Sequence, residues 1–266
     1  MSRFLNGATI MRTATVESLK IARETGYAGI EARAERLLED PPEVATASAA
    51  ARPAEVWSLN GVRISLRPDG SLDQPLLEAD LDRRLEVCRA LGAGYLLAVP
   101  PRMGGLTEDA ALAGIRGGLR IARDGAARIG VRIAFEFLGF FDCPIGTPAA
   151  AARAVDGLDD VDLVLDSCHW HASGSRPLDR FPVGRLAMVH LNDAPPKPLD
   201  EIEDADRLLP GLGVIRLAEL ISVLRRRGYD GPWSLETFNP TYWDEDPREI
   251  ARRGAAAVDA LVEAQG

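Results

Sequence analysis

The chain has 266 residues, a net charge of -9 and 46% apolar residues, which fits one large α/β domain with a sizeable core. The acidic balance speaks against a nucleic-acid binder, which would present a basic face. Neither an apolar run of about 20 residues nor an apolar signal segment occurs, so we expect a cytoplasmic protein without a membrane span. Three cysteines without CxxC spacing predict neither a disulfide framework nor a thiolate zinc site, although Cys143 and Cys168 follow predicted strands and could line a pocket.

Short apolar runs alternate with amphipathic stretches along the chain, which predicts eight strands with helices after most of them. The predicted strands span residues 4–9, 29–32, 55–60, 95–99, 131–137, 161–166, 186–191 and 232–236. The first helix would be capped by Thr13 or Thr15, and Thr147 would open another. The other predicted helices span residues 34–39, 78–91, 107–129, 217–227 and 247–264.

The alternation also decides the fold class. Strict β–α alternation implies a parallel sheet with right-handed crossovers, and eight units in this length favour a single (β/α)8 TIM barrel over residues 1–266. No GxGxxG or GxxxxGK[ST] motif follows the first strand, so the sequence lacks the usual signature of a nucleotide-binding fold at this position. Residues 45–51 read as a small-residue helix or a loop. Residues 194–198 read as part of a long proline-rich loop of the kind that serves barrel sites.

Four polar residues end successive predicted strands: Glu136, Asp166, His190 and Glu236. Working groups of a barrel come from these carboxyl ends, and neighbouring strands lie about 4.8 Å apart, so the four should meet at the barrel mouth. Three carboxylates packed together repel unless a cation lies between them. Three oxygen ligands and one imidazole suit one divalent metal ion, which could be Mn²⁺, Mg²⁺, Co²⁺, Fe²⁺ or Zn²⁺.

Each of these residues also has an ordinary interpretation when taken alone. Glu136 could belong to a polar rim, Asp166 could cap a helix, and His190 could be a hydrogen-bonded core histidine. The coincidence on consecutive strands favours the metal site. His169 lies one helical turn after Asp166 and is our candidate for contacting a substrate oxygen.

Other residues are candidates for the substrate pocket. His171 could make a second substrate contact or support its loop, and both alternatives stay open. Trp170 is expected to wall the pocket, while Trp57, Phe140 and Tyr242 could wall it or simply pack in the core.

The motifs of the chain resemble those of the xylose-isomerase-like barrel superfamily of sugar isomerases and epimerases, and within it the inosose isomerases of inositol catabolism. The similarity covers essentially the whole chain. The motifs include Asn6–Thr9, Ile30–Arg33, Ala134–Phe137, Leu163–Ser167 with His169, Val189–Asp193, Asp206–Arg207 and Ser234–Glu236.

The resemblance implies metal binding by Glu136, Asp166, His190 and Glu236, and substrate contact by His169 and Arg207. We assign Asn6 and Glu31, which belong to the same motifs, to substrate contact as well. The loop after the fifth strand, residues 139–144, is more aromatic than we expect for an inositol-specific pocket.

The resulting hypothesis is a metal-dependent isomerase or epimerase of a small polyhydroxylated ketone, such as an inosose or a ketose. Glu136 or Glu236 would remove a proton next to the carbonyl, and the other or His169 would return one. A dehydratase or lyase on the same barrel is the alternative, because the same enolate could expel a leaving group. A DNA-repair endonuclease would need more histidines and a basic groove, and a non-catalytic sugar-binding barrel would not need the metal ligands. The oligomeric state stays open, with a homo-oligomer as one option.

Overall fold

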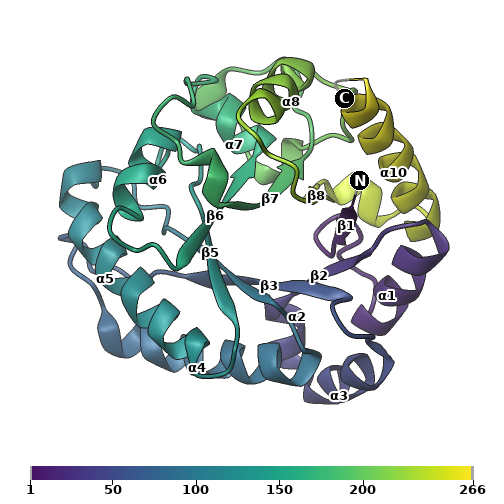
Figure 1. Ribbon diagram of the computed structural model, residues 1–266, viewed down its shortest axis with the longest axis horizontal. Helices are drawn as coiled ribbons and strands as arrows, with labels where there is room; N and C mark the ends of the chain where they lie inside the picture. The colour runs from purple at the N-terminus through teal and green to yellow at the C-terminus, as the bar shows by residue number, and fades with distance from the viewer. Residues whose placement is uncertain (1, 265–266) are drawn as a thin grey trace.

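Eight parallel strands follow one another in chain order around a closed barrel, and the first strand pairs with the last (Figure 1). A computed structural model describes residues 2–264; Met1, Gln265 and Gly266, the ends of the predicted domain, lie outside the described residues. The predicted (β/α)8 fold class is therefore confirmed. The strands are β1 (Arg3–Asn6), β2 (Gly29–Arg33), β3 (Val56–Arg63), β4 (Tyr95–Val99), β5 (Arg132–Glu136), β6 (Val161–Asp166), β7 (Leu186–Leu191) and β8 (Trp233–Leu235).

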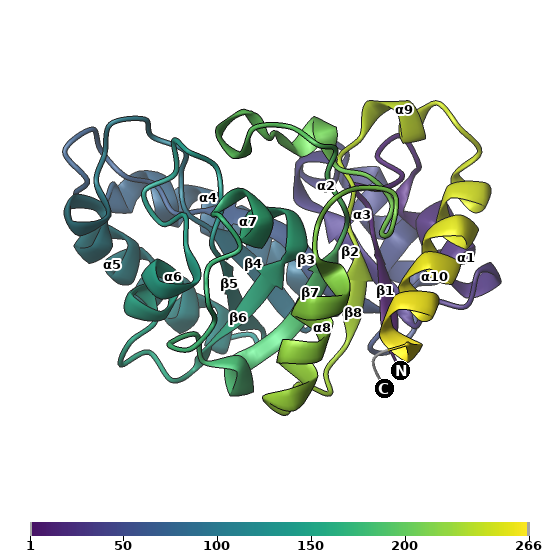
Figure 2. The same cartoon turned by 90° about the horizontal axis from the view of Figure 1, so that it is seen from above.

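Helices surround the barrel on its outside, and loops from the carboxyl ends of the strands gather over one of its mouths (Figures 1 and 2). Short 3-10 turns at Val183–Arg185, Leu199–Glu201 and Asp204–Asp206 flank β7. The helices are α1 (Thr15–Glu24), α2 (Ala34–Glu39), α3 (Pro41–Ala50), α4 (Gln74–Leu91), α5 (Glu108–Ala127), α6 (Pro148–Ala154), α7 (Ser167–Ala172), α8 (Leu217–Arg226), α9 (Pro240–Trp243) and α10 (Pro247–Glu263).

Capping side chains explain where several helices begin. Helix α4 starts at Gln74, four residues before the predicted start, because Asp73 accepts a hydrogen bond from the nitrogen of Leu76 at 3.5 Å. Residues 45–50 belong to helix α3, which Asp40 caps. The predicted cap of the first helix was wrong. Ala14 occupies the cap position of α1, and Thr15 instead donates from its nitrogen and hydroxyl to Glu43.

Two-residue periodicity along the strands separates the barrel interior from its outer layer. One set of side chains packs between the strands and the surrounding helices and forms the main core. The alternate set points inward and fills the barrel with a small apolar cluster that includes Phe4, Leu97, Ala134, Val164 and Met188. The next inward positions along β5, β6 and β7 are two residues further on, at the carboxyl ends of these strands. They carry the polar residues described below.

No helix among residues 2–264 combines the length and the apolar character that crossing a membrane requires.

Candidate metal centre and active site

The barrel brings together four side chains that the sequence places at the ends of successive strands. Glu136 ends β5, Asp166 ends β6, His190 lies next to the end of β7, and Glu236 directly follows β8. Each offers one ligand atom, and these atoms all lie within 4.8 Å of one another. All four side chains are buried. The two-residue periodicity therefore places three carboxylates and one imidazole at a single point above the apolar filling of the barrel.

Asp166 uses its two carboxylate oxygens differently. Its Oδ1 accepts a hydrogen bond from the backbone nitrogen of His169 at 2.8 Å and so caps helix α7. Its Oδ2 accepts from Nδ2 of Asn192 at 2.6 Å and from Nη1 of Arg207 at 2.9 Å. The two interpretations of Asp166 in the sequence, helix cap and member of a metal cluster, are thus compatible in one residue.

The two ring nitrogens of His190 face different carboxylates. Nδ1 lies 3.1 Å from Oε1 of Glu136 and 3.1 Å from Oε2 of Glu236, whereas Nε2 lies 3.2 Å from Oε1 of Glu31. A carboxylate behind a histidine of this kind fixes the ring and leaves the other nitrogen to face a metal. Glu31 is fully buried. It also accepts hydrogen bonds from three neighbouring side chains, those of Asn6, Ser58 and Ser234.

Arg207 is almost fully buried and contacts several members of the cluster. Its Nη1 donates to Asp166 and, at 2.7 Å, to Oε2 of Glu236. Its Nη2 lies 2.8 Å from Oδ1 of Asp204 and 3.0 Å from Nε2 of His169. The guanidinium can only donate, so Nε2 of His169 must accept, which places the proton of a neutral His169 ring on Nδ1. That Nδ1 is buried and has no hydrogen-bond partner in the described structure.

Burial and neighbouring charges raise the pKa values of some groups in the cluster and lower those of others. Burial raises the pKa of Glu136 to about 7. Burial would also raise the pKa of Glu236, but His190 and Arg207 outweigh it and hold that pKa well below its ordinary value. For His190, burial acts to lower the pKa, yet Glu236, Glu31 and Glu136 together raise it well above the usual value. Burial and Arg207 lower the pKa of His169, which keeps its ring neutral.

The charge and the donor atoms of the cluster fit a divalent cation. Four carboxylates meet here, those of Glu31, Glu136, Asp166 and Glu236, and within residues 2–264 Arg207 is the one arginine or lysine paired with any of them. The excess of negative charge needs a further positive charge or bound protons. Carboxylate oxygens and an imidazole, without thiolates, suit the hard and borderline divalent ions considered above.

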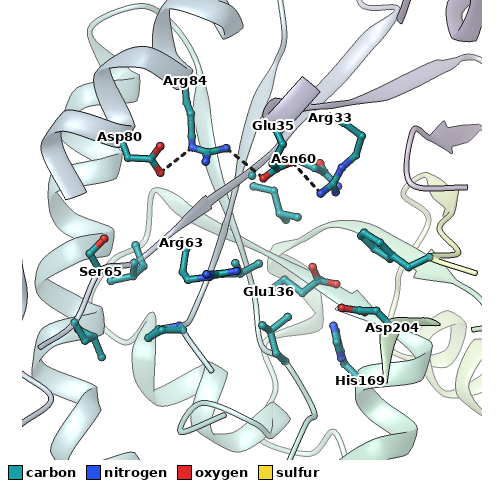
Figure 3. Close-up of a pocket in the computed structure, with 18 of the residues that line it drawn as sticks. Arg33, Glu35, Asn60, Arg63, Ser65, Asp80, Arg84, Glu136, His169 and Asp204 are labelled. Atoms are coloured by element: carbon teal, nitrogen blue, oxygen red, sulfur yellow. Dashed lines mark hydrogen bonds and ion pairs between the residues drawn. The ribbon is translucent and has the colours of Figure 1, made fainter. Parts of the chain in front are cut away.

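A cavity of about 1020 Å³ opens above the cluster (Figure 3). Glu136, Glu236, His169 and Arg207 line its inner end, so these four are within reach of a ligand. Phe140 packs edge-on against the His169 ring, with 4.8 Å between ring centroids. The cavity also extends between the end of β3 and helix α4, a part of the site that the sequence did not indicate.

Other predicted substrate contacts lie elsewhere. Asn6 and Glu31 are buried beneath the cavity and do not line it; Asn6 donates to Glu31 at 3.1 Å and to Glu236 at 2.8 Å. Trp170 is buried, and its indole nitrogen donates to the carbonyl oxygen of Arg176. His171 is half-buried and is not a lining residue either. These positions favour supporting roles for the four residues.

The aromatic and cysteine candidates do not line the cavity either. Trp57, Phe140 and Tyr242 are not lining residues; Trp57 stacks on Tyr95 with 4.5 Å between ring centroids. Cys143 and Cys168 are buried thiols that do not line this cavity.

The fold and the cluster together define a class of protein. Residues 19–261 match the model of the xylose isomerase-like TIM barrel family, and the chain belongs to this family. The family resemblance of the sequence motifs is thereby confirmed.

Three similar proteins narrow the comparison. An inosose isomerase from Halalkalibacterium halodurans is 32% identical over 188 residues, which cover 67% of this chain and 64% of that protein, just under two thirds of its length. A crystal structure of the IolI protein with a bound zinc atom superposes with a TM-score of 0.87 at 25% identity and covers 100% of this chain and 99% of the other. A 3-dehydroshikimate dehydratase from Pseudomonas aeruginosa is 30% identical over 68% of this chain but only 28% of its own length.

Proposed function

We propose that the chain is a divalent-metal-dependent isomerase or epimerase of a small polyhydroxylated ketone, of the inosose or ketose type. Glu136, Asp166, His190 and Glu236 would be the metal ligands. The observation that carries the proposal is the convergence of these four buried ligand atoms within 4.8 Å at the inner end of a large cavity. The similarity to an inosose isomerase and to a zinc-bound IolI structure supports it.

The bound ion would supply Lewis-acid stabilisation of the negative charge that develops on adjacent substrate oxygens during proton transfer. Two carboxylates face the cavity, Glu136 from β5 and Glu236 from the end of β8, so they approach a ligand from different sides of the barrel mouth. One removes the proton from carbon next to the carbonyl. The other, or His169, returns a proton at the neighbouring carbon for isomerisation, or on the opposite face for epimerisation.

His169 and Arg207 would orient the substrate. His169 lines the cavity, and its unpartnered Nδ1 carries the proton that a substrate oxygen can accept. Arg207 holds the Nε2 side of the same ring and pairs with Asp166 and Glu236. The guanidinium therefore fixes the tautomer and position of His169 as well as the carboxylates around it. Its own Nε is also buried without a partner.

A dehydratase or lyase is the second candidate, and the similarity to a 3-dehydroshikimate dehydratase favours keeping it. The first proton transfer would be the same, but the electron pair would then expel a β-leaving group. A lyase forms a conjugated chromophore, whereas an isomerase does not, so ultraviolet absorbance during turnover separates the two.

The direct test combines metal content and proton exchange. We expect the purified protein to hold about one divalent ion per chain by mass spectrometry. We also expect it to exchange the proton next to the carbonyl of inososes or ketohexoses for deuterium in D₂O. A chain that binds no divalent ion, or that exchanges no proton on any hydroxyketone tested, would contradict the proposal.

The sharpest variant is Glu236→Gln, which keeps the shape of the side chain and removes its capacity to hold a proton. We expect turnover to fall by about 10²–10⁴-fold, the usual contribution of a general acid–base group. The thermal unfolding midpoint should change little. The matched control is Glu245→Gln, on an exposed residue paired with Arg253, which should leave turnover unchanged. Full activity of Glu236→Gln would remove this residue from the mechanism.

A further inference from the structure

The cavity has a second end, away from the four-residue cluster. This outer arm is lined by six charged residues from the end of β2, from α2, from the end of β3 and from α4: Arg33, Glu35, Arg63, Asp80, Arg83 and Arg84. Figure 3 shows Arg63 among the residues that line the cavity, with Ser65 and Glu136 on either side of it in this view. A ligand that reaches both ends would meet metal-ligating carboxylates at one and guanidinium groups at the other.

Positive charge exceeds negative charge in the outer arm. Four arginines face two carboxylates, and both carboxylates are already engaged. Glu35 pairs with Arg33 at 3.0 Å and lies 3.7 Å from Arg84, while Asp80 accepts from Arg84 at 2.8 Å. Arg63 and Arg83 have no ion-pair partner among residues 2–264. The arm thus offers two guanidinium groups that no protein carboxylate neutralises.

A buried donor in the same arm also favours a negatively charged ligand. Arg84 is only 9% exposed, and its Nε donates to Asp80. Its Nη1 is buried and makes no hydrogen bond within residues 2–264, and the carboxylate oxygen it pairs with, Oε1 of Glu35, is 3.7 Å away. A buried guanidinium nitrogen without an acceptor is unfavourable, and a ligand that supplies an oxygen removes the deficit. Arginine suits carboxylates and phosphates because its planar group presents paired donors.

We propose that the outer arm binds an anionic substituent of the substrate, a carboxylate or a phosphate, through Arg63, Arg83 and Arg84. The proposal rests on the proposed function for the identity of the other end, where the ketone would react. The cavity, about 1020 Å³, is at the upper limit of ordinary small-molecule sites and exceeds what a neutral six-carbon polyol requires. The outer arm would thus favour a polyhydroxy ketone that carries an acidic or phosphorylated substituent over an otherwise identical neutral one.

The test measures binding and does not depend on turnover. Three ligands share one six-carbon polyol chain and differ at one end: D-glucitol, D-gluconate and D-glucitol 6-phosphate. Each is titrated calorimetrically into the protein at constant ionic strength, first after treatment with chelator and then with Mn²⁺ supplied. We expect at least one anionic ligand to bind about tenfold to a hundredfold more tightly than D-glucitol in both conditions.

Variants assign the preference to the outer arm. Arg63 and Arg83 are exposed, so Arg63→Gln and Arg83→Gln should fold normally, which thermal unfolding verifies. Each should weaken the anionic ligand about tenfold and leave D-glucitol unaffected. The control is Arg89→Gln, an exposed arginine on the same helix α4 that does not line the cavity, and it should change neither affinity.

The outcomes separate the two proposals. Equal binding of neutral and anionic ligands, an anion preference that survives both outer-arm substitutions, or no binding of any of the three ligands would each overturn the anionic subsite. An anion preference in the chelated protein that disappears in Arg63→Gln supports the subsite even if no divalent ion binds. In that case the proposed metal-dependent reaction fails while the subsite stands.

Discussion

Two groups of buried carboxylates differ in how their charge is balanced, one around Glu43 and Glu55 and the other at the barrel mouth. On the outside of the barrel, Glu43 accepts hydrogen bonds from the nitrogen and hydroxyl of Thr15 and pairs with Arg36, and Glu55 pairs with Arg23. Each carboxylate there has its own arginine, and its pKa is lowered from the ordinary value.

At the barrel mouth, by contrast, four carboxylates share one arginine and one histidine. These are Glu31, Glu136, Asp166 and Glu236, which contact only Arg207 and His190 as cationic partners in the described part of the chain. Burial accordingly raises the pKa of Glu136 to about 7. Arginines of the protein neutralise the outer carboxylates, whereas those at the mouth carry a surplus of negative charge that no protein cation among residues 2–264 neutralises. Such a surplus indicates a site that binds a cation.

The comparison is tested most strongly by replacing one carboxylate in each region. Glu31→Gln should weaken the binding of Mn²⁺ or Zn²⁺ about tenfold to a hundredfold, because Glu31 supports His190 from behind. Glu43→Gln should leave metal affinity unchanged, since Glu43 contacts no member of the cluster. Calorimetric titration with the two ions measures both values. Equal metal affinity in wild type and Glu31→Gln would contradict the role given to Glu31.

The pH dependence of metal binding sharpens the same contrast. Without metal, His190 has a raised pKa and holds a proton, and the pKa of Glu136 is about 7. Both protons must leave before an ion binds, so affinity should fall as the pH falls from about 8 to 6, by up to about tenfold per pH unit for each proton released. Calorimetry in buffers of different ionisation enthalpy counts these protons. Metal affinity that stays constant over this range would contradict the proposed ligand set.

In the outer region the expected effect is on stability and not on metal binding. Burial alone would raise the pKa of Glu43, but hydrogen bonds from Arg36 and Thr15 lower it below the ordinary value of 4.5. A lowered folded-state pKa contributes stability above the unfolded-state pKa and loses it as the pH falls through the folded-state value. Glu43→Gln should therefore cost about 1–3 kcal/mol at pH 7 and less below pH 4.5.

Urea unfolding of wild type and Glu43→Gln at several pH values checks this prediction. Glu245→Gln serves as the exposed control and should unfold like wild type. A difference between Glu43→Gln and wild type that is the same at every pH would show that Glu43 acts through packing and not through its charge.

The strand ends of the candidate site were predictable because strand periodicity is local. Apolar runs that stop at Glu136, Asp166 or His190 indicate both the strand and its end, and a closed barrel then brings consecutive ends together. The convergence of these side chains within 4.8 Å follows from that rule. Their roles as ligands remain a proposal.

The remaining features depend on tertiary contacts that periodicity does not encode. Glu31 lies in the middle of β2, and its place beneath His190 depends on how far each strand is shifted along the barrel. The sequence analysis did not single out Arg63, Arg83 or Arg84, because no local signal tells which face of α4 or which strand end borders the cavity. The capping error at α1 has a similar origin, since Glu43 lies 28 residues away in the chain from the threonine it engages.

The two carboxylate oxygens of Asp166 connect the cap of helix α7 to the four-residue cluster. One oxygen holds the first turn of α7, which carries His169, while the other lies among the groups that would surround a metal ion. A cation that displaces Asp166 even slightly must also displace that turn and the imidazole on it. The chain thereby has a mechanical connection, only three residues long, through which filling the metal site would shift the imidazole that we propose contacts a substrate oxygen.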